Sequence, residues 1–403
     1  MQIRGNLLQQ SEHFNSGPAN WVLFFGSVFF FVVNLFASIS IFPSYSLAIG
    51  SSPFLAGLQN TVFSVMAVAL RFFFGPVMDR QGPKPMMLLG VFAFATTPLL
   101  LMLSPTYPML LTARIYQSIG LSVYLPGIST LAADMAPPDK IGTYLGASRI
   151  FINLGLLAGP SAALFVIGEF NYESWFALSA ITCAISFFLL YAVKTPDVSH
   201  RAGQVAGSLH QIRKVLTEKQ IYPIIGGIVL YSFTYSAVVS FAAVHIEAAS
   251  PNSQAPYFFI VMGIAGVAGC LGAGALSDVL TRQKLAWPLL MILGTGAMAF
   301  SLIYLSPILI IVCAIILGLG IQGSSLVFAA WLIDLSKPEL RATTMSLQEN
   351  SIDIMFAMGA LAFGLAAQGP GLGSAFLTVG ILTFIAALPL ARISGRIISG
   401  KNQ

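Results

Sequence analysis

Long runs of apolar residues, separated by short polar connections, follow one another along almost the whole chain. Each run holds about 20 residues or more, enough for a helix to cross a ~30 Å hydrocarbon core. The short period-two pattern of barrel strands is absent. The pattern therefore predicts an all-α integral membrane protein with twelve transmembrane helices, at 20–48, 54–78, 85–104, 107–135, 140–168, 173–193, 221–247, 256–279, 285–305, 307–335, 340–368 and 372–394.

The composition strengthens this prediction and narrows the function. Hydrophobic residues make up 57% of the chain and charged residues 8%, with a mean hydropathy of +0.85, whereas soluble domains carry roughly a quarter of charged residues. The three cysteines fall inside predicted helices without metal-ligand spacing, so no metal and no cofactor is expected. No phosphate-binding loop and no catalytic pattern crosses the helices, which argues against an enzyme.

The positive charges decide the predicted orientation. Sixteen of the nineteen Lys and Arg residues lie in the terminal segments or in alternate connections, and the intervening connections hold none. Because such residues concentrate on the cytoplasmic side, both termini are expected in the cytoplasm. The net charge of +5 is then accounted for by topology and not by a nucleic-acid partner. Compact connections without N-x-[ST] sequons favour a bacterial plasma membrane.

The one long polar stretch lies between the sixth and seventh helices. It predicts an N-terminal six-helix bundle at 1–195, a cytoplasmic linker at 196–220 and a C-terminal six-helix bundle at 221–403. Apolar residues at helical spacing between 209 and 216 allow a short amphipathic surface helix, and a solvated linker is the alternative.

The two halves resemble each other in sequence. A shift of 199 or 200 residues superposes several Gly, Asp and Thr positions: Gly75 on Gly274, Asp79 on Asp278, Gly120 on Gly320, Asp134 on Asp334, Thr143 on Thr343 and Gly159 on Gly359. The repeat keeps the same direction through the membrane, so it predicts two pseudo-symmetric bundles related by an axis along the membrane normal.

A charged, glycine-containing motif follows the second helix and is repeated after the eighth. The first copy lies in FFFGPVMDRQGPKPMML at 72–88 and the second in GALSDVLTRQK at 274–284. The first resembles motif A of the major facilitator superfamily of secondary transporters. The resemblance implies the major facilitator fold and cytoplasmic gate latches built from Gly75, Asp79, Arg80, Gly82, Lys84, Gly274, Asp278 and Arg282.

Two further motifs resemble the drug:proton antiporter branch of that family. Arg114 and Gln117 in the fourth helix resemble motif B, which implies a place beside the central cavity and a part in proton movement. A structural Arg bonded to carbonyls is the alternative. Gly155, Gly159 and Pro160 in the fifth helix resemble the antiporter motif C, and ordinary small-residue helix packing is the alternative.

Two acids lie well inside an apolar helix. Glu349 and Asp353 are four residues apart and share one helix face, about 13 Å from the helix start for Glu349. Two carboxylates this close in a low dielectric disfavour double ionisation, which suits a proton carrier. Their counterparts at a shift of 200 are Arg149 and Asn153. The alternative is a structural ion pair that closes the cytoplasmic gate, with Arg71 as the partner.

Aromatic and polar side chains on the presumed cavity helices suit a large amphipathic ligand. The predicted substrate-binding residues are Asn34, Gln117, Tyr124, Arg149, Tyr231, Tyr235, Gln322, Phe328 and Trp331.

Together these features predict a transporter that exports a small organic or amphipathic molecule, a drug or metabolite, in exchange for protons by alternating access. The resemblance to the family implies that it works as a monomer. Proton-coupled uptake of an organic anion or sugar and a gradient-independent facilitator are alternatives with the same fold. A membrane receptor or scaffold that transports nothing is a further alternative.

Overall fold

The computed structural model describes residues 17–137, 140–196, 217–218, 220–249, 254–336 and 341–399. Within these residues the chain forms twelve long helices and one short 3₁₀ turn, and no strand, which confirms the predicted all-α class. The first six helices are α2 (Pro18–Ala48), α3 (Pro53–Gln81), α4 (Pro83–Leu103), α5 (Tyr107–Met135), α6 (Ile141–Glu169) and α7 (Tyr172–Ala192). The other elements are α9 (Ile221–Ala249), α10 (Ala255–Val279), α11 (Arg282–Phe300), η1 (Ile303–Leu305), α12 (Pro307–Leu335), α13 (Arg341–Gln368) and α14 (Leu372–Ser399).

The connection between α3 and α4 is shorter than the predicted loop. Helix α3 continues through Asp79 and Arg80 to Gln81, and α4 begins at Pro83, so Gly82 alone separates them. Gly82 has a φ of 82°, a backbone conformation that residues other than glycine rarely adopt. Pro83 then starts the next helix at the position where its missing N–H is harmless. The charged motif therefore lies mainly on helix ends.

The ninth predicted helix ends earlier than its apolar run indicated. Helix α11 stops at Phe300, and the chain tightens into the 3₁₀ turn before α12 begins at Pro307. Proline disfavours helical geometry in the residue before it, and Ser306 is accordingly extended with a φ of −163°. The apolar residues up to 305 thus belong to a turn that joins two helices. The predicted helix was too long because hydropathy alone does not register the constraint that a proline places on the residue before it.

Ten of the described helices are long and apolar enough to span a membrane. The other two long helices, α5 and α11, fall below that threshold. Helix α5 carries a charged residue at Arg114, and α11 begins with Arg282 and Lys284. The chain is therefore a multi-pass membrane protein. The linker predicted at 196–220, and any amphipathic helix in it, lies almost wholly outside the described residues.

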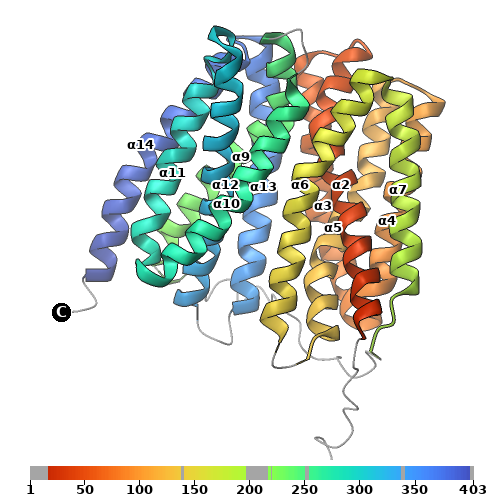
Figure 1. The fold of residues 1–403 in the computed structure, drawn as a ribbon, viewed down its shortest axis with the longest axis horizontal. Helices are drawn as coiled ribbons and strands as arrows, with labels where there is room; N and C mark the ends of the chain where they lie inside the picture. The colour runs from red at the N-terminus through yellow and green to blue at the C-terminus, as the bar shows by residue number, and fades with distance from the viewer. Residues whose placement is uncertain are drawn as a thin grey trace, which may run out of the picture.

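The helices form two groups of six that stand side by side (Figure 1). Helices α2 to α7 pack mainly on one another, as do α9 to α14, and three helix pairs carry the main contacts between the groups: α3 with α13, α6 with α10, and α2 with α9. We call the end at which α2, α4, α6, α9, α11 and α13 begin the basic end, because the Lys- and Arg-bearing connections lie there. The opposite end is called the far end.

Candidate functional site

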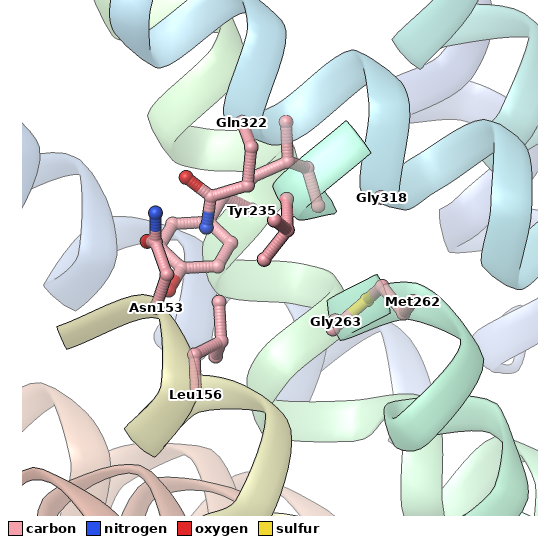
Figure 2. A pocket seen from close by; sticks show the side chains of 9 residues that line it. Asn153, Leu156, Tyr235, Met262, Gly263, Gly318 and Gln322 are labelled. Carbon is pink, nitrogen blue, oxygen red and sulfur yellow. The ribbon is translucent and has the colours of Figure 1, made fainter. Parts of the chain in front are cut away.

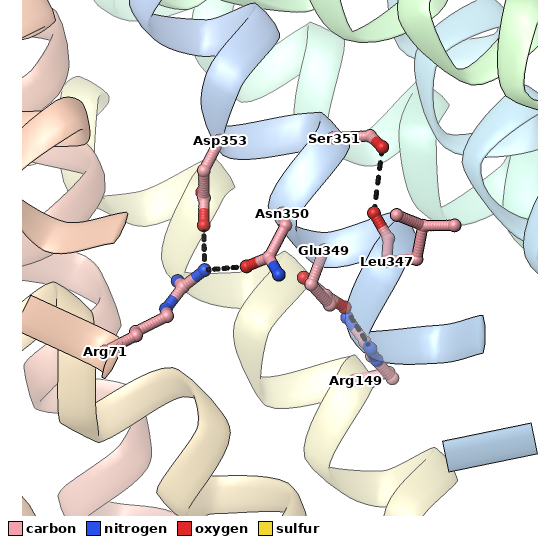
Figure 3. A network of polar contacts seen from close by, with 7 residues as sticks. All are labelled: Arg71, Arg149, Leu347, Glu349, Asn350, Ser351 and Asp353. Atoms are coloured by element: carbon pink, nitrogen blue, oxygen red, sulfur yellow. Dashed lines mark hydrogen bonds and ion pairs between the residues drawn. The ribbon is translucent and has the colours of Figure 1, made fainter. Parts of the chain in front are cut away.

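Helix α13 carries two ion pairs to the other half of the molecule (Figure 3). Asp353 pairs with Arg71 of α3, and the same guanidinium also donates to the side-chain oxygen of Asn350 at 3.4 Å. The Arg71 and Asp353 side chains are only 17% and 16% exposed. The structure therefore brings Asp353 to the arginine that the sequence suggested as its alternative partner.

The second ion pair joins two residues that the internal repeat relates to each other. Arg149 of α6 donates to Glu349 of α13 at 2.9 Å, and the two positions are 200 residues apart. Their side chains are 56% and 40% exposed. Both acids that the sequence singled out are thus neutralised by arginines of the first half, one in a mostly buried pair and one in an exposed pair.

Arg114 lies apart from these carboxylates in the buried interior of α5. Its guanidinium donates to the side-chain oxygens of Gln117, at 2.6 Å, of Asn60, and of Ser38, at 3.4 Å. It also lies over the Phe63 ring, 3.9 Å from the centroid. These three acceptors are neutral, so the charge is stabilised by dipoles and by a ring face, as in a cation–π contact.

Asn60 extends this buried polar group to the second half. Its amide nitrogen donates to the Ile39 carbonyl at 3.0 Å and to the Ser240 hydroxyl of α9 at 3.2 Å. Arg114 and Ser240 therefore hold the two ends of one side chain. The buried cation is connected to the boundary between the halves, although it lines no described cavity.

A narrow cavity, open on one side and with enclosed room for about one water molecule, lies between α6 of the first half and α9, α10 and α12 of the second (Figure 2). Its polar side chains are Asn153, Tyr235 and Gln322, and none of the nine lining residues is charged. The rest of the wall is apolar or glycine, contributed by Leu156, Met262, Gly263, Val267, Gly318 and Ile321.

The structure separates the predicted substrate-binding residues into two sets. Tyr235 and Gln322 line the cavity, and Arg149 lies one helical turn from its Asn153. The others lie inside the halves. The Asn34 amide donates to Thr182 at 2.9 Å, and the Tyr124 hydroxyl lies 2.7 Å from that of Ser27.

In the second half the remaining predicted residues form an aromatic stack. Tyr231 lies parallel to Phe328, with 6.1 Å between the ring centroids, and Phe328 is followed by Trp331. All three are buried. Gln117 is likewise occupied by Arg114. These side chains stabilise the interiors of the bundles, and none of them lines the described cavity.

Sequence reasoning named Asn153 only as the repeat counterpart of Asp353 and assigned it no role. The signal that could have found it is its position, four residues after Arg149 on the same face of an otherwise apolar helix. A polar residue at that place has to meet protein, water or ligand, because lipid offers no hydrogen-bond partner.

The motif residues at the basic end contact helices of their own half. Lys84 donates to the carbonyls of Tyr191, at 2.9 Å, and Val193, at 2.6 Å, at the end of α7. Arg282 forms an ion pair with Asp334 at the end of α12, at 2.7 Å. Arg80 is exposed. A Cβ at Gly274 would have its nearest neighbouring atom 3.7 Å away, so no close contact requires glycine there. The side chains of Asp79 and Asp278 are not among those that the structure describes.

The glycines of the fifth predicted helix lie where α6 crosses α2. A Cβ at Gly155 would overlap Val32, and one at Gly159 would overlap the Val33 carbonyl and lie 3.0 Å from the Ala37 nitrogen. Only glycine permits this close helix approach. Pro160 follows within the same helix.

Comparisons with known proteins agree with this architecture. A family model described as Major Facilitator Superfamily matches residues 23–308. Quinolone resistance protein NorA of Staphylococcus aureus (strain Mu50 / ATCC 700699) is 22% identical over 218 residues, which cover 54% of this chain and 55% of NorA. Riboflavin transporter RibZ of Clostridioides difficile (strain 630) is 24% identical over 129 residues, 32% of this chain and 28% of RibZ. The match thus spans about half of NorA and less of RibZ.

Solved structures of transporters superpose on nearly the whole chain. A variant of the nucleoside transporter NupG has a TM-score of 0.77 at 13% identity, covering 94% of this chain and 99% of that one. Peptide transporter POT in complex with sulfate has a TM-score of 0.77 at 16% identity, covering 94% and 95%. At such identities the likeness shows the fold alone.

Proposed function

This chain belongs to the major facilitator superfamily and is a multi-pass membrane transporter, not an enzyme; from that premise we propose that it exports a small organic molecule in exchange for protons. In this proposal the basic end faces the cytoplasm of a bacterial cell. The protein acts as a monomer, and bundles 1–195 and 221–403 rock against each other about a midplane site.

The observation that carries the proposal is the pairing of both α13 acids with arginines of the other half. Arg71 and Arg149 belong to α3 and α6, whereas Asp353 and Glu349 belong to α13. A proton that binds either carboxylate removes its charge and with it the ionic attraction across the boundary. A proton and an arginine of the other half therefore compete for the same carboxylate, so protonation favours separation of the halves at this level, which is the physical basis of coupling.

Two features support export over uptake. The packing of Gly155 and Gly159 against α2 matches the resemblance to the antiporter motif. The relative NorA is named a quinolone resistance protein, which supports an organic, drug-like substrate.

We further propose that the basic-end motifs keep each half rigid while the halves move. Lys84 ties α4 to the end of α7, and Arg282 ties α11 to the end of α12. Asp79 and Asp278 are proposed to complete the latches, with Gly75, Arg80, Gly82 and Gly274 shaping the helix ends. Substrate is proposed to bind at Tyr235 and Gln322, and Arg114 to support proton movement through its link to Asn60.

The test is substrate-driven proton movement in proteoliposomes under an imposed pH gradient, measured with a panel of lipophilic cations, neutral amides and organic anions. We expect Glu349→Gln or Asp353→Asn to abolish coupled export. Glu169→Gln, at the exposed far end of α6, is the matched control and is expected to behave as the native protein. Coupling that survives in both α13 variants would show that the coupled proton does not bind to this helix.

The same assay decides the alternatives. Substrate flux that ignores the gradient would identify a facilitator whose ion pairs only hold the halves together. Accumulation of an anion or sugar inside right-side-out vesicles would identify an uptake permease.

A further inference from the structure

The cavity between the halves presents hydrogen-bonding groups and no charge. Asn153, Tyr235 and Gln322 come from three helices, α6, α9 and α12, and all three line the same space (Figure 2). Their side-chain polar atoms have no hydrogen-bond partner among the described residues. All three residues are half-buried, so their polar atoms stay within reach of water or of a ligand, as polar groups in proteins require.

The donor and acceptor inventory of these side chains defines what they recognise. Asn153 and Gln322 each offer an amide with two N–H donors and one carbonyl acceptor, and Tyr235 adds a hydroxyl that does both. A ligand group that both donates and accepts can therefore satisfy all three. An amide, lactam or imide has this property without a formal charge.

The surroundings disfavour a charged group. None of the nine lining residues is charged, and an ionised group without an opposite charge loses its hydration when it is buried there. The nearest charges along α6 are at Arg149, one turn from Asn153 toward the basic end. Arg149 and Glu349 already neutralise each other at 2.9 Å, so they offer no uncompensated charge to a ligand.

Neighbouring residues hold the polar groups in place. A Cβ at position 266 would lie 2.8 Å from the Gln322 Cγ, so Gly266 leaves room for that side chain. The Tyr235 ring lies edge-on to Phe356, with 5.4 Å between centroids. Close neighbours thus limit the space around Gln322 and Tyr235, two of the three polar side chains.

We infer that this cavity binds a neutral amide-type group of the substrate through Asn153, Tyr235 and Gln322 and discriminates against carboxylates and ammonium groups of the same shape. The inference rests on the proposed function for the identity of the ligand as a substrate. It goes beyond that function because it assigns the substrate class and gives Asn153 a role in recognition.

The test compares three ligands with one aromatic body: 1-naphthamide, 1-naphthoate and 1-naphthylmethylammonium. Binding to the purified protein in lipid nanodiscs is measured by titration calorimetry, without any gradient. We expect 1-naphthamide to bind about tenfold tighter than either charged ligand, the cost of one or two lost hydrogen bonds. Equal or tighter binding of either charged ligand, or no binding of 1-naphthamide, would overturn the inference.

Isosteric variants then place the ligand in this cavity. Asn153→Asp and Gln322→Glu keep the side-chain shape, and each is expected to weaken 1-naphthamide and strengthen 1-naphthylmethylammonium, reversing the preference. Gln322→Met, which keeps the length without hydrogen bonds, is expected to weaken 1-naphthamide about tenfold and leave the charged ligands unchanged. Gln368→Glu, exposed at the end of α13, is the control for added charge.

An unchanged preference in Asn153→Asp and Gln322→Glu would show that the ligand binds elsewhere and would overturn the inference. Because binding is measured without a gradient, loss of proton exchange leaves this result untouched. Proton-coupled transport of only the charged ligands would instead retain the proposed function and reject the substrate class.

Discussion

Two helix pairs that the internal repeat relates hold the halves together by different means. At the α3–α13 contact, Arg71 pairs with Asp353 and Thr61 donates to the Ala357 carbonyl at 2.9 Å. The two backbones touch nearer the far end of the same contact. A Cβ added to Gly364 would lie only 3.0 Å from the Gly57 Cα.

At the α6–α10 contact, no hydrogen bond or ion pair joins the described residues of the two helices. Leu157 packs against Gly263, where a Cβ would lie 2.6 Å from the Leu157 Cγ. The described cavity opens beside this contact, with Asn153 and Leu156 on α6 and Gly263 and Val267 on α10.

This difference assigns proton response and substrate binding to different helix contacts, whereas in a symmetric molecule both contacts would be alike. An ionic contact changes its strength when a carboxylate gains a proton, whereas an apolar contact does not. The α3–α13 contact is thus suited to respond to protons, and the α6–α10 contact leaves space for substrate. Four substitutions test how far this division holds.

The largest effect is expected from Asp353→Leu. It leaves the mostly buried Arg71 guanidinium with the neutral Asn350 side chain as its acceptor, at 3.4 Å, and uncompensated buried charges cost about 3–5 kcal/mol. The free energy of unfolding in an SDS titration should fall by that amount. The double variant Arg71→Met with Asp353→Leu should recover most of the loss, because no charge is then left unpaired; a double variant as unstable as the single one would contradict this account.

The next largest effect is expected from Gly57→Ala. Its Cβ would overlap the Ala360 carbonyl oxygen of α13, and backbone atoms cannot rotate aside. We expect a loss of about 1–3 kcal/mol in the same titration, together with a slower initial rate of transport. Gly168→Ala, where nothing lies within 4 Å, is the control, and equal losses in both variants would rule out the close contact as the cause.

A smaller effect is expected from Gly263→Ala in the apolar contact. The obstructing atoms belong to the Leu157 side chain; the outer ones can turn away, whereas the Cβ moves only with its helix, so the loss should be about 1–2 kcal/mol. Adding Leu157→Gly, which removes that Cβ as well, should relieve the overlap, and a double-mutant cycle should give a favourable coupling between the two changes. Strictly additive losses would show that the two residues do not meet.

The smallest effect on stability is expected from Glu349→Gln. Its ion pair with Arg149 is 40% and 56% exposed, and exposed pairs contribute about 0–1 kcal/mol. The small loss should shrink further at high salt, which screens exposed charges. A loss of unfolding free energy as large as that of Asp353→Leu would mean that both ion pairs stabilise the contact between the halves equally.

The two halves also differ inside, and the sequence shows only part of that difference. A shift of 200 places Arg114 on Ala314 and Gln117 on Leu317, so the buried polar group of α5 has no equivalent in α12. The sequence revealed the unpaired cation. It placed Gln117 beside Arg114 on one helix but did not reveal Asn60 and Ser38, because those residues come from α3 and α2.

The sequence by itself determined the helices, the repeat and the family. Each apolar run had to form a helix because lipid leaves backbone groups no other partner. Run lengths and prolines set nearly every helix boundary. The helix ends at Gln81 and Phe300 were not predicted, because hydropathy does not detect a single-glycine connection or a 3₁₀ turn.

Only the tertiary structure decided which charges meet and which side chains share the cavity. Helices of similar composition can pack in many orders, and contacts such as Arg71 with Asp353 join positions 282 residues apart. The pairing of Arg149 with Glu349 was foreshadowed by the repeat, whereas the meeting of Asn153 with Gln322 was not. Local pattern fixes the face that a residue occupies, and packing of the two bundles fixes what that face touches.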